Sequence, residues 1–194
     1  DGSPETGDVY IGGQWRTILV GGLNKGGRGY YALDVTNPAS PIALWEVCAD
    51  SSMCAISDSD IGYTYGNPVI TKRPSDGRWV VLVTSGYNNV SPGDGKGYLY
   101  VLDAATGAIL DKIGTGAGST TTPSGLAKIT ARAENANTDN TGTTVFGGDV
   151  LGNLWRFDMT ANTVVKLASL PPSSVKRVVM FPTGSVIVAT SPRS

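Results

Sequence analysis

Short runs of apolar and β-branched residues alternate with clusters of glycine, asparagine, aspartate and proline along the chain. The runs WRTILVGG, RWVVLVTSG and TTVFGGD are each followed by a glycine-rich turn and a second apolar run that ends in aspartate. Short runs of β-formers between turn residues are typical of strands joined as hairpins. The pattern therefore predicts an all-β chain.

These hairpins form an internal repeat. Equivalent glycines at Gly22, Gly86 and Gly148 are 64 and 62 residues apart, and each hairpin is followed by a third short run: PIALWEV, AILDKIG and TVVKLAS. The runs GNPVITK and GLAKITA precede the second and third hairpins and would add a fourth, innermost strand. Four antiparallel strands in each repeat predict the blades of a β-propeller.

The number of repeats predicts a partial ring. Propellers typically close with about 4 to 8 blades, so the roughly three to four blades of this chain make an arc, and a closed four-bladed ring is the alternative. We treat the whole chain, 1–194, as propeller, with three blade-like repeats and a partial blade at about 7–56, 57–118, 119–170 and 171–194.

The repeat is longer than the roughly 40 to 50 residues of common propeller repeats. Two inserted loops, 48–65 and 131–143, account for the difference. Loops held by a rigid scaffold commonly carry function. We therefore expect the functional surface on these two loops.

Polar and aromatic residues recur at fixed places in the repeat. Asp34, Asp103 and Asp158 end the same strand in each hairpin, where a carboxylate accepts backbone N–H bonds from the next turn. This recurrence predicts an architectural role for all three. We assign the strand aromatics to packing between blades, with a ligand-stacking platform as the alternative: Trp15, Tyr31, Trp45, Trp79, Tyr98, Tyr100, Trp155 and Phe157.

Charge and composition exclude several functional classes. The 15 basic and 16 acidic residues are spread along the chain, so no basic patch predicts a nucleic-acid partner. The longest apolar runs, such as 79–83, are far shorter than the roughly 20 residues of a membrane-spanning helix. The chain has no histidine, and no serine or cysteine has an assignable base partner. We expect no enzyme, no nucleic-acid partner and no membrane span.

The two cysteines indicate an oxidising compartment. Cys48 and Cys54 lack the paired CxxC motif or histidine partners of a zinc site, and we predict a disulfide that closes a small loop. Asp58 and Asp60 follow this loop, and we interpret them as solvated carboxylates rather than a cation site. The chain starts without Met or a signal-like apolar segment, which favours the middle of a longer polypeptide.

Longer strings carry a resemblance to a known family. WRTILVGGLNKGGRGYYALDVTNP, IGYTYGNPVI, WVVLVTSGYNN, GKGYLYVLDAATG and GGDVLGNLWRFDM occur in this order within residues 7–159. They resemble the C-terminal propeller of PilY-type pilus proteins. A quinoprotein-like dehydrogenase, the enzyme alternative, has adjacent cysteines over its quinone, whereas five residues separate the two cysteines here.

The resemblance implies a non-catalytic extracellular protein at the pilus tip or outer-membrane surface of a Gram-negative bacterium. It implies support of type IV pilus assembly, control of retraction, and adhesion. The implied partners are pilin or minor pilin-like subunits, the remainder of its own propeller, and a host or abiotic surface. A periplasmic or outer-membrane scaffold propeller is the alternative.

The resemblance also implies a calcium loop just before the GGD segment. The matching oxygen-bearing residues are Asn135, Asn137, Asp139, Thr141 and Thr143. Asp139 is the one carboxylate among them, whereas the family loop has three or four. Because calcium affinity rises with ligand charge, we expect calcium binding to be weak or absent, and a turn capped by Asn and Thr is the alternative.

Overall fold

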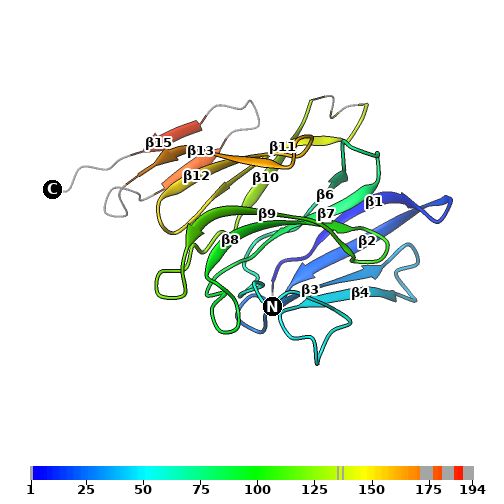
Figure 1. Cartoon of the computed structure of the whole chain (residues 1–194). Helices are drawn as coiled ribbons and strands as arrows, with labels where there is room; N and C mark the ends of the chain where they lie inside the picture. The colour runs from blue at the N-terminus through cyan, green and yellow to red at the C-terminus, as the bar shows by residue number, and fades with distance from the viewer. Residues whose placement is uncertain (1, 135, 137, 171–176, 181–185, 190–194) are drawn as a thin grey trace.

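The computed structural model describes residues 2–134, 136, 138–170, 177–180 and 186–189. Within these residues all regular structure is β-strand, arranged in three sheets and a hairpin (Figure 1). The prediction of an all-β fold is confirmed. No helix in the described part is long and apolar enough to cross a membrane.

The second and third sheets have the predicted four-stranded antiparallel order. The second contains β6 (Val69–Lys72), β7 (Trp79–Thr84), β8 (Lys96–Asp103) and β9 (Ile109–Gly118). The third contains β10 (Ile129–Ala133), β11 (Gly142–Gly148), β12 (Asn153–Asp158) and β13 (Thr163–Ser169). The two runs predicted as fourth strands are β6 and β10, which form equivalent edges.

The first sheet has two strands more than the three that the sequence pattern indicated. It contains β1 (Glu5–Ile11), β2 (Gln14–Gly22), β3 (Gly29–Asp34), β4 (Ile42–Cys48) and the short parallel strand β5 (Ile56–Ser57). The prediction missed the short β5, and it also missed β1. The sequence feature that could have indicated β1 is the Gly12-Gly13 pair. Its positive φ angles of 60° and 80° suit the tight turn of a two-residue hairpin.

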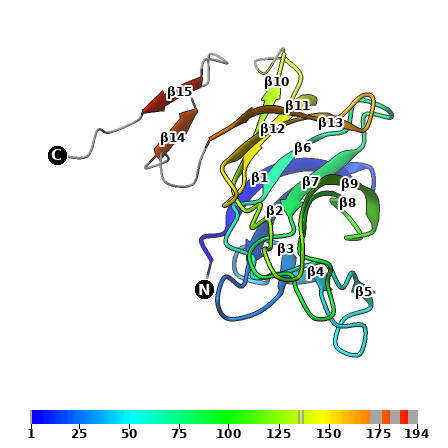
Figure 2. The same ribbon diagram turned by 60° about the vertical axis from the view of Figure 1, so that its left-hand side comes forward.

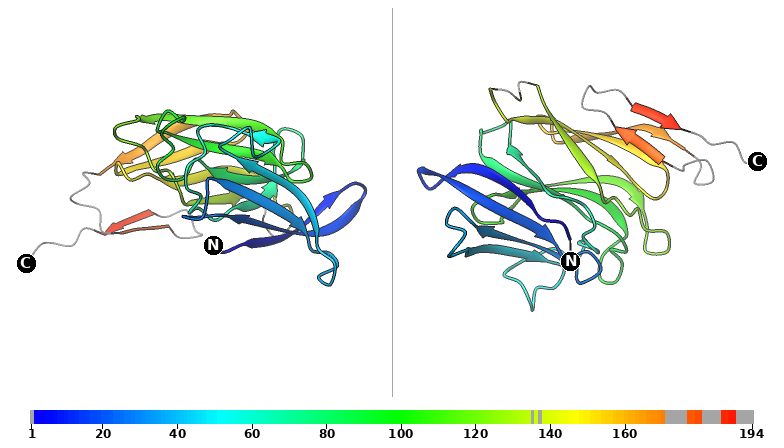
Figure 3. Two further views of the ribbon diagram at one scale, coloured as in Figure 1. Left: turned by 90° about the horizontal axis from the view of Figure 1, so that it is seen from below. Right: turned by 180° about the vertical axis from the view of Figure 1, so that it is seen from behind.

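The sheets lie side by side as an arc (Figure 2). β6 contacts both β1 and β10, whereas β9 contacts β13 at the opposite edge. The further hairpin, β14 (Arg177–Met180) with β15 (Val186–Ala189), extends beyond the third sheet and away from β1–β4 (Figure 3). The chain is therefore part of a ring and not a closed four-bladed one.

Two apolar layers hold the three sheets together. Alternate residues of β7 point to opposite faces, so Val81 and Val83 pack towards the first sheet while Val80 and Leu82 pack towards the third. All four are at most 2% exposed. Burying a side chain of this size contributes about 1.5 to 3 kcal/mol, which makes β7 the central element of the core.

The recurring aspartates fix the turns, as predicted. The carboxylate of Asp103 accepts bonds of 3.0 Å from the backbone N–H groups of Ala105 and Thr106. Asp34 and Asp158 accept equivalent bonds from the residues that follow them. Their role is architectural.

Most of the strand aromatics are buried between sheets, whereas Trp15 packs against Trp79 of the second sheet but is largely exposed. Its side chain is 62% exposed because it lies near the free end of the β1–β2 hairpin, where it contacts Tyr10 and the edge of Trp79. Trp15 is therefore available at the surface.

Candidate functional site

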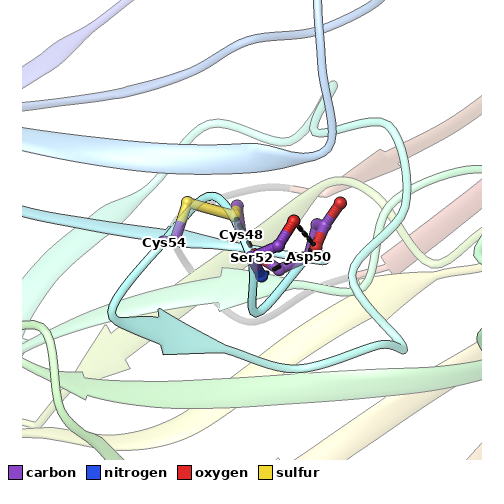
Figure 4. Close-up of a disulfide and its surroundings, with 4 residues drawn as sticks. All are labelled: Cys48, Asp50, Ser52 and Cys54. Atoms are coloured by element: carbon purple, nitrogen blue, oxygen red, sulfur yellow. Dashed lines mark hydrogen bonds between the residues drawn. A yellow bond between two sulfur atoms is a disulfide. The ribbon is translucent and has the colours of Figure 1, made fainter.

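The first inserted loop is closed by the predicted disulfide, which is confirmed. Cys48 is the last residue of β4, and its Cα lies 5.9 Å from that of Cys54, to which it is bonded (Figure 4). Inside the loop, the hydroxyl and backbone N–H of Ser52 donate bonds of 2.7 and 2.8 Å to Asp50, and these bonds lower the pKa of Asp50. The loop thus has a defined shape.

A cleft of about 890 Å³ lies between this disulfide loop and the β2–β3 turn. Its lining includes Arg28, Tyr31 and Met53. The guanidinium of Arg28 donates to the carbonyl oxygens of Ile61 at 2.8 Å and of Ser59 at 3.3 Å. Arg28 therefore ties the turn to the segment after the disulfide, and the cleft is walled by fixed elements.

A charged cluster fastens the segment after the disulfide to the second sheet. The Lys112 ammonium, on β9, lies 2.8 Å from both carboxylate oxygens of Asp58 and 2.7 Å from Asp60 Oδ2. The side chains of Asp58 and Asp60 are 18% and 14% exposed. The interpretation of these two aspartates as solvated carboxylates was wrong, because a lysine from another element neutralises them.

Two tyrosines of β8 complete this cluster. The Lys112 ammonium lies 4.4 Å from the ring centroid of Tyr98 and 5.6 Å from that of Tyr100, within the range of cation–π attraction. The phenol of Tyr100 donates to Asp58 Oδ1 at 3.1 Å. Burial, followed by the negative charges of Asp58 and Asp60, raises the pKa of Tyr100, so this phenol stays protonated and serves as a donor.

The second inserted loop places its carboxylate beside a lysine. Asp139 Oδ1 lies 3.0 Å from the ammonium of Lys72, the last residue of β6, and accepts a 2.8 Å bond from the Thr141 hydroxyl. The backbone N–H of Lys72 donates to the Asn140 carbonyl oxygen at 2.8 Å. The loop is thus attached to the second sheet through backbone and side chain.

Among the described residues of the predicted calcium loop, Asp139 is the one carboxylate, and a lysine lies beside it. The ammonium of Lys72 already lies beside Asp139, and the Thr141 hydroxyl donates to the same carboxylate; the ligand expected from Thr141 is its backbone carbonyl, which this bond does not involve. Thr143 is an argument for a calcium site, because its buried Oγ1 has no hydrogen-bond partner among the described residues. One neutral hydroxyl does not replace the missing carboxylates, since calcium takes six to eight oxygen ligands. Asn135 and Asn137, the other predicted ligands, lie outside the described residues.

The structural roles of Lys72, Lys112 and Arg28 were not predicted from the sequence. Each of these side chains bonds to a segment far away in the chain. The spacing of nearby residues in the sequence does not predict such pairs. Each of these cations forms hydrogen bonds or ion pairs with protein groups around it. Within the described ranges no group of three or more Asp, Glu, Cys or His side chains is placed to hold a metal ion.

The arrangement defines a class of protein: a β-propeller segment with two inserted loops fixed by ion pairs and a disulfide. The chain belongs to the family of the PilY1 beta-propeller domain, which it matches over residues 1–186. The resemblance carried by its longer sequence strings is thereby confirmed.

Several relatives are similar across most of the chain. Type IV pilus biogenesis factor PilY1 of Pseudomonas aeruginosa (strain PAK) is 38% identical over 164 residues, which cover 84% of this chain and 13% of that protein. A PilY1 homolog of Xylella fastidiosa is 34% identical over 169 residues, covering 82% and 11%. The chain therefore spans about one eighth of the length of these relatives.

A solved structure supports the fold. The crystal structure of the Pseudomonas aeruginosa PilY1 C-terminal domain matches with a TM-score of 0.72 and 31% identity. The match covers 98% of this chain and 40% of the crystallised one. The prediction of a partial propeller is confirmed, because the chain corresponds to less than half of that larger domain.

Proposed function

We propose that this chain is a non-catalytic propeller segment of a type IV pilus biogenesis factor. The observation that carries the proposal is the family match over residues 1–186, together with 38% identity to PilY1 of Pseudomonas aeruginosa. The factor acts outside the cell, at the pilus tip or outer-membrane surface of a Gram-negative bacterium. The Cys48–Cys54 disulfide supports this location, since disulfides persist in oxidising compartments.

The proposed role is to promote pilus assembly against retraction and to provide surface for attachment. Its partners are pilin or minor pilin-like subunits, the remainder of its own propeller, and a host or abiotic surface. Contact with other polypeptide is supported at the β1–β2 end of the arc, where the adjacent Tyr10 and Trp15 are 50% and 62% exposed. Exposed apolar groups gathered at one end of a sheet are commonly covered in an assembly.

The test is an in-frame deletion of this segment in the bacterium that carries it. Surface pili are counted in a normal strain and in one unable to retract its pili. We expect few or no pili in the first strain and recovery in the second. Normal pilus numbers and normal attachment after the deletion would overturn the proposal. An envelope defect with normal pili would favour a general scaffold propeller instead.

Attachment is separated from assembly with a surface variant. The double substitution Tyr10→Ser with Trp15→Ser removes exposed aromatic area and leaves the core positions of β1 and β2 unchanged. We expect normal pilus numbers with reduced attachment to a hydrophobic surface. The control substitution is Val165→Ser, because Val165 on β13 is also a largely exposed apolar side chain, at 46%. Equal attachment by both variants would remove the adhesive part of the proposal.

A further inference from the structure

We propose that lysine ammonium groups act as tethered cations at both inserted loops and take the place of calcium. Lys112 is the cation that pairs with Asp58 and Asp60, and Lys72 is the cation that pairs with Asp139. The folded state of this chain is then independent of calcium. The inference concerns how the loops are held, and it stands whether or not the chain works on a pilus.

The first loop gives the stronger geometric case, because protein donors occupy every carboxylate oxygen. Both oxygens of Asp58 and one of Asp60 contact the Lys112 ammonium. The other oxygen of Asp60 accepts a 2.7 Å bond from the backbone N–H of Asp94. The backbone N–H of Asp60 also donates to Asp58 Oδ1 at 2.9 Å. A calcium ion would have to displace the ammonium to reach these oxygens.

The position of Lys112 is fixed by the sheet itself. Lys112 on β9 lies opposite Tyr100 on β8 in the antiparallel register, and its ammonium lies close to the Tyr98 and Tyr100 rings as well as to the carboxylates. Little conformational entropy remains to be lost when the pair forms, unlike in a flexible surface ion pair. The ammonium is therefore a built-in counterion for the segment after the disulfide.

The second loop has the same arrangement, with one carboxylate facing the lysine in place of two. The Lys72 ammonium contacts Asp139 at 3.0 Å and lies 5.6 Å from the ring centroid of Trp79. Both lysines thus lie on an edge strand of the second sheet, place their ammonium group near an aromatic ring and pair with a loop carboxylate. Because Asp139 and Lys72 cancel in charge, the loop has little remaining attraction for a dication.

The test compares Lys112→Met with the wild-type full chain. Removing the ammonium leaves Asp58 and Asp60 close together and uncompensated, and a divalent ion can then replace it. We expect calcium at 5 mM to change the wild-type melting temperature by less than about 1 °C relative to chelator, and to raise that of Lys112→Met by several degrees. Lys96→Met is the matched control, since Lys96 pairs with Asp94 but is 45% exposed, and no gain is expected there.

Calorimetric titration with calcium alone provides a second readout that does not depend on the variant folding. Saturable binding to the wild type below millimolar calcium would overturn the proposal. It would also be overturned if Lys112→Met folded and gained no more from calcium than Lys96→Met. A Lys112→Met chain that folds with calcium but not with chelator would support it directly.

Discussion

The indole nitrogen of Trp45 donates a 2.9 Å hydrogen bond to the carbonyl oxygen of Ala104 and so joins the first sheet to the second. Trp45 is 6% exposed, and its ring lies against the turn that contains Gly107. A Cβ added at Gly107 would lie 2.7 Å from the Trp45 ring. The turn between β8 and β9 is therefore shaped to receive this tryptophan.

Gly107→Ala is expected to destabilise the protein through this contact. Gly107 has a φ of 72°, as does Gly116, but nothing lies within 4 Å of a Cβ at Gly116. Both substitutions carry the backbone cost of a positive φ, and only Gly107→Ala forces Trp45 to move, at a further cost of about 1 to 3 kcal/mol. Chemical denaturation of the two variants measures the difference. Equal losses of unfolding free energy would mean that the Trp45 contact is unimportant.

Breaking the disulfide is expected to lower stability moderately. Cys48 and Cys54 are six residues apart, and loop-closure entropy for so short a loop corresponds to about 2 kcal/mol. Denaturant unfolding with and without a reducing agent should show this loss, and the double variant Cys48→Ser with Cys54→Ser should not respond to the reductant. A loss well above this range would indicate that reduction also releases the Lys112 cluster.

Asp94 makes stability depend on acid pH. Burial raises its pKa, but bonds from the backbone N–H of Lys96 and the hydroxyl of Tyr98 outweigh this and lower the pKa to about 2. Because the folded pKa lies below the unfolded one, this contribution is present above about pH 4 and is lost as the pH falls through about 2. Tyr98→Phe should raise the Asp94 pKa and reduce the acid-dependent loss.

Carboxyl ¹³C titration by NMR measures the Asp94 pKa directly. Tyr31→Phe is the control, because no bond from its hydroxyl to a carboxylate is found among the described residues. The same Asp94 pKa in all three proteins would show that the 2.7 Å Tyr98 bond does not set it.

The sequence was informative wherever a feature is local. Strand runs, the turn carboxylates of Asp34, Asp103 and Asp158, and the disulfide depend on residues close together in the chain. β1 was missed because its apolar residues are few and mixed with Glu5, Thr6 and Asp8. The exposure of Trp15 was missed because strand alternation does not tell which part of a hairpin extends beyond its neighbour.

The loop sites could not be derived in the same way. Lys112 meets Asp58 across 54 residues, and Lys72 meets Asp139 across 67. Oxygen-bearing residues in a loop suggest a cation, but the sequence gives no indication that a lysine from a distant strand supplies it. The positive charge at both loops is a product of sheet register, which becomes known only with the fold.

The buried hydroxyl of Thr143 gives an independent test of the calcium-loop hypothesis. Its Oγ1 has no hydrogen-bond partner among the described residues, and a buried polar group without a partner costs about 1 to 3 kcal/mol. Thr143→Val has a similar shape without the hydroxyl, so stability should stay equal or rise by up to about 1 kcal/mol. Thr143→Ser keeps the hydroxyl, loses a methyl group, and should be less stable. If Thr143→Val were instead strongly destabilised only when calcium is present, the hydroxyl would be a calcium ligand and Lys72 would not have replaced the ion.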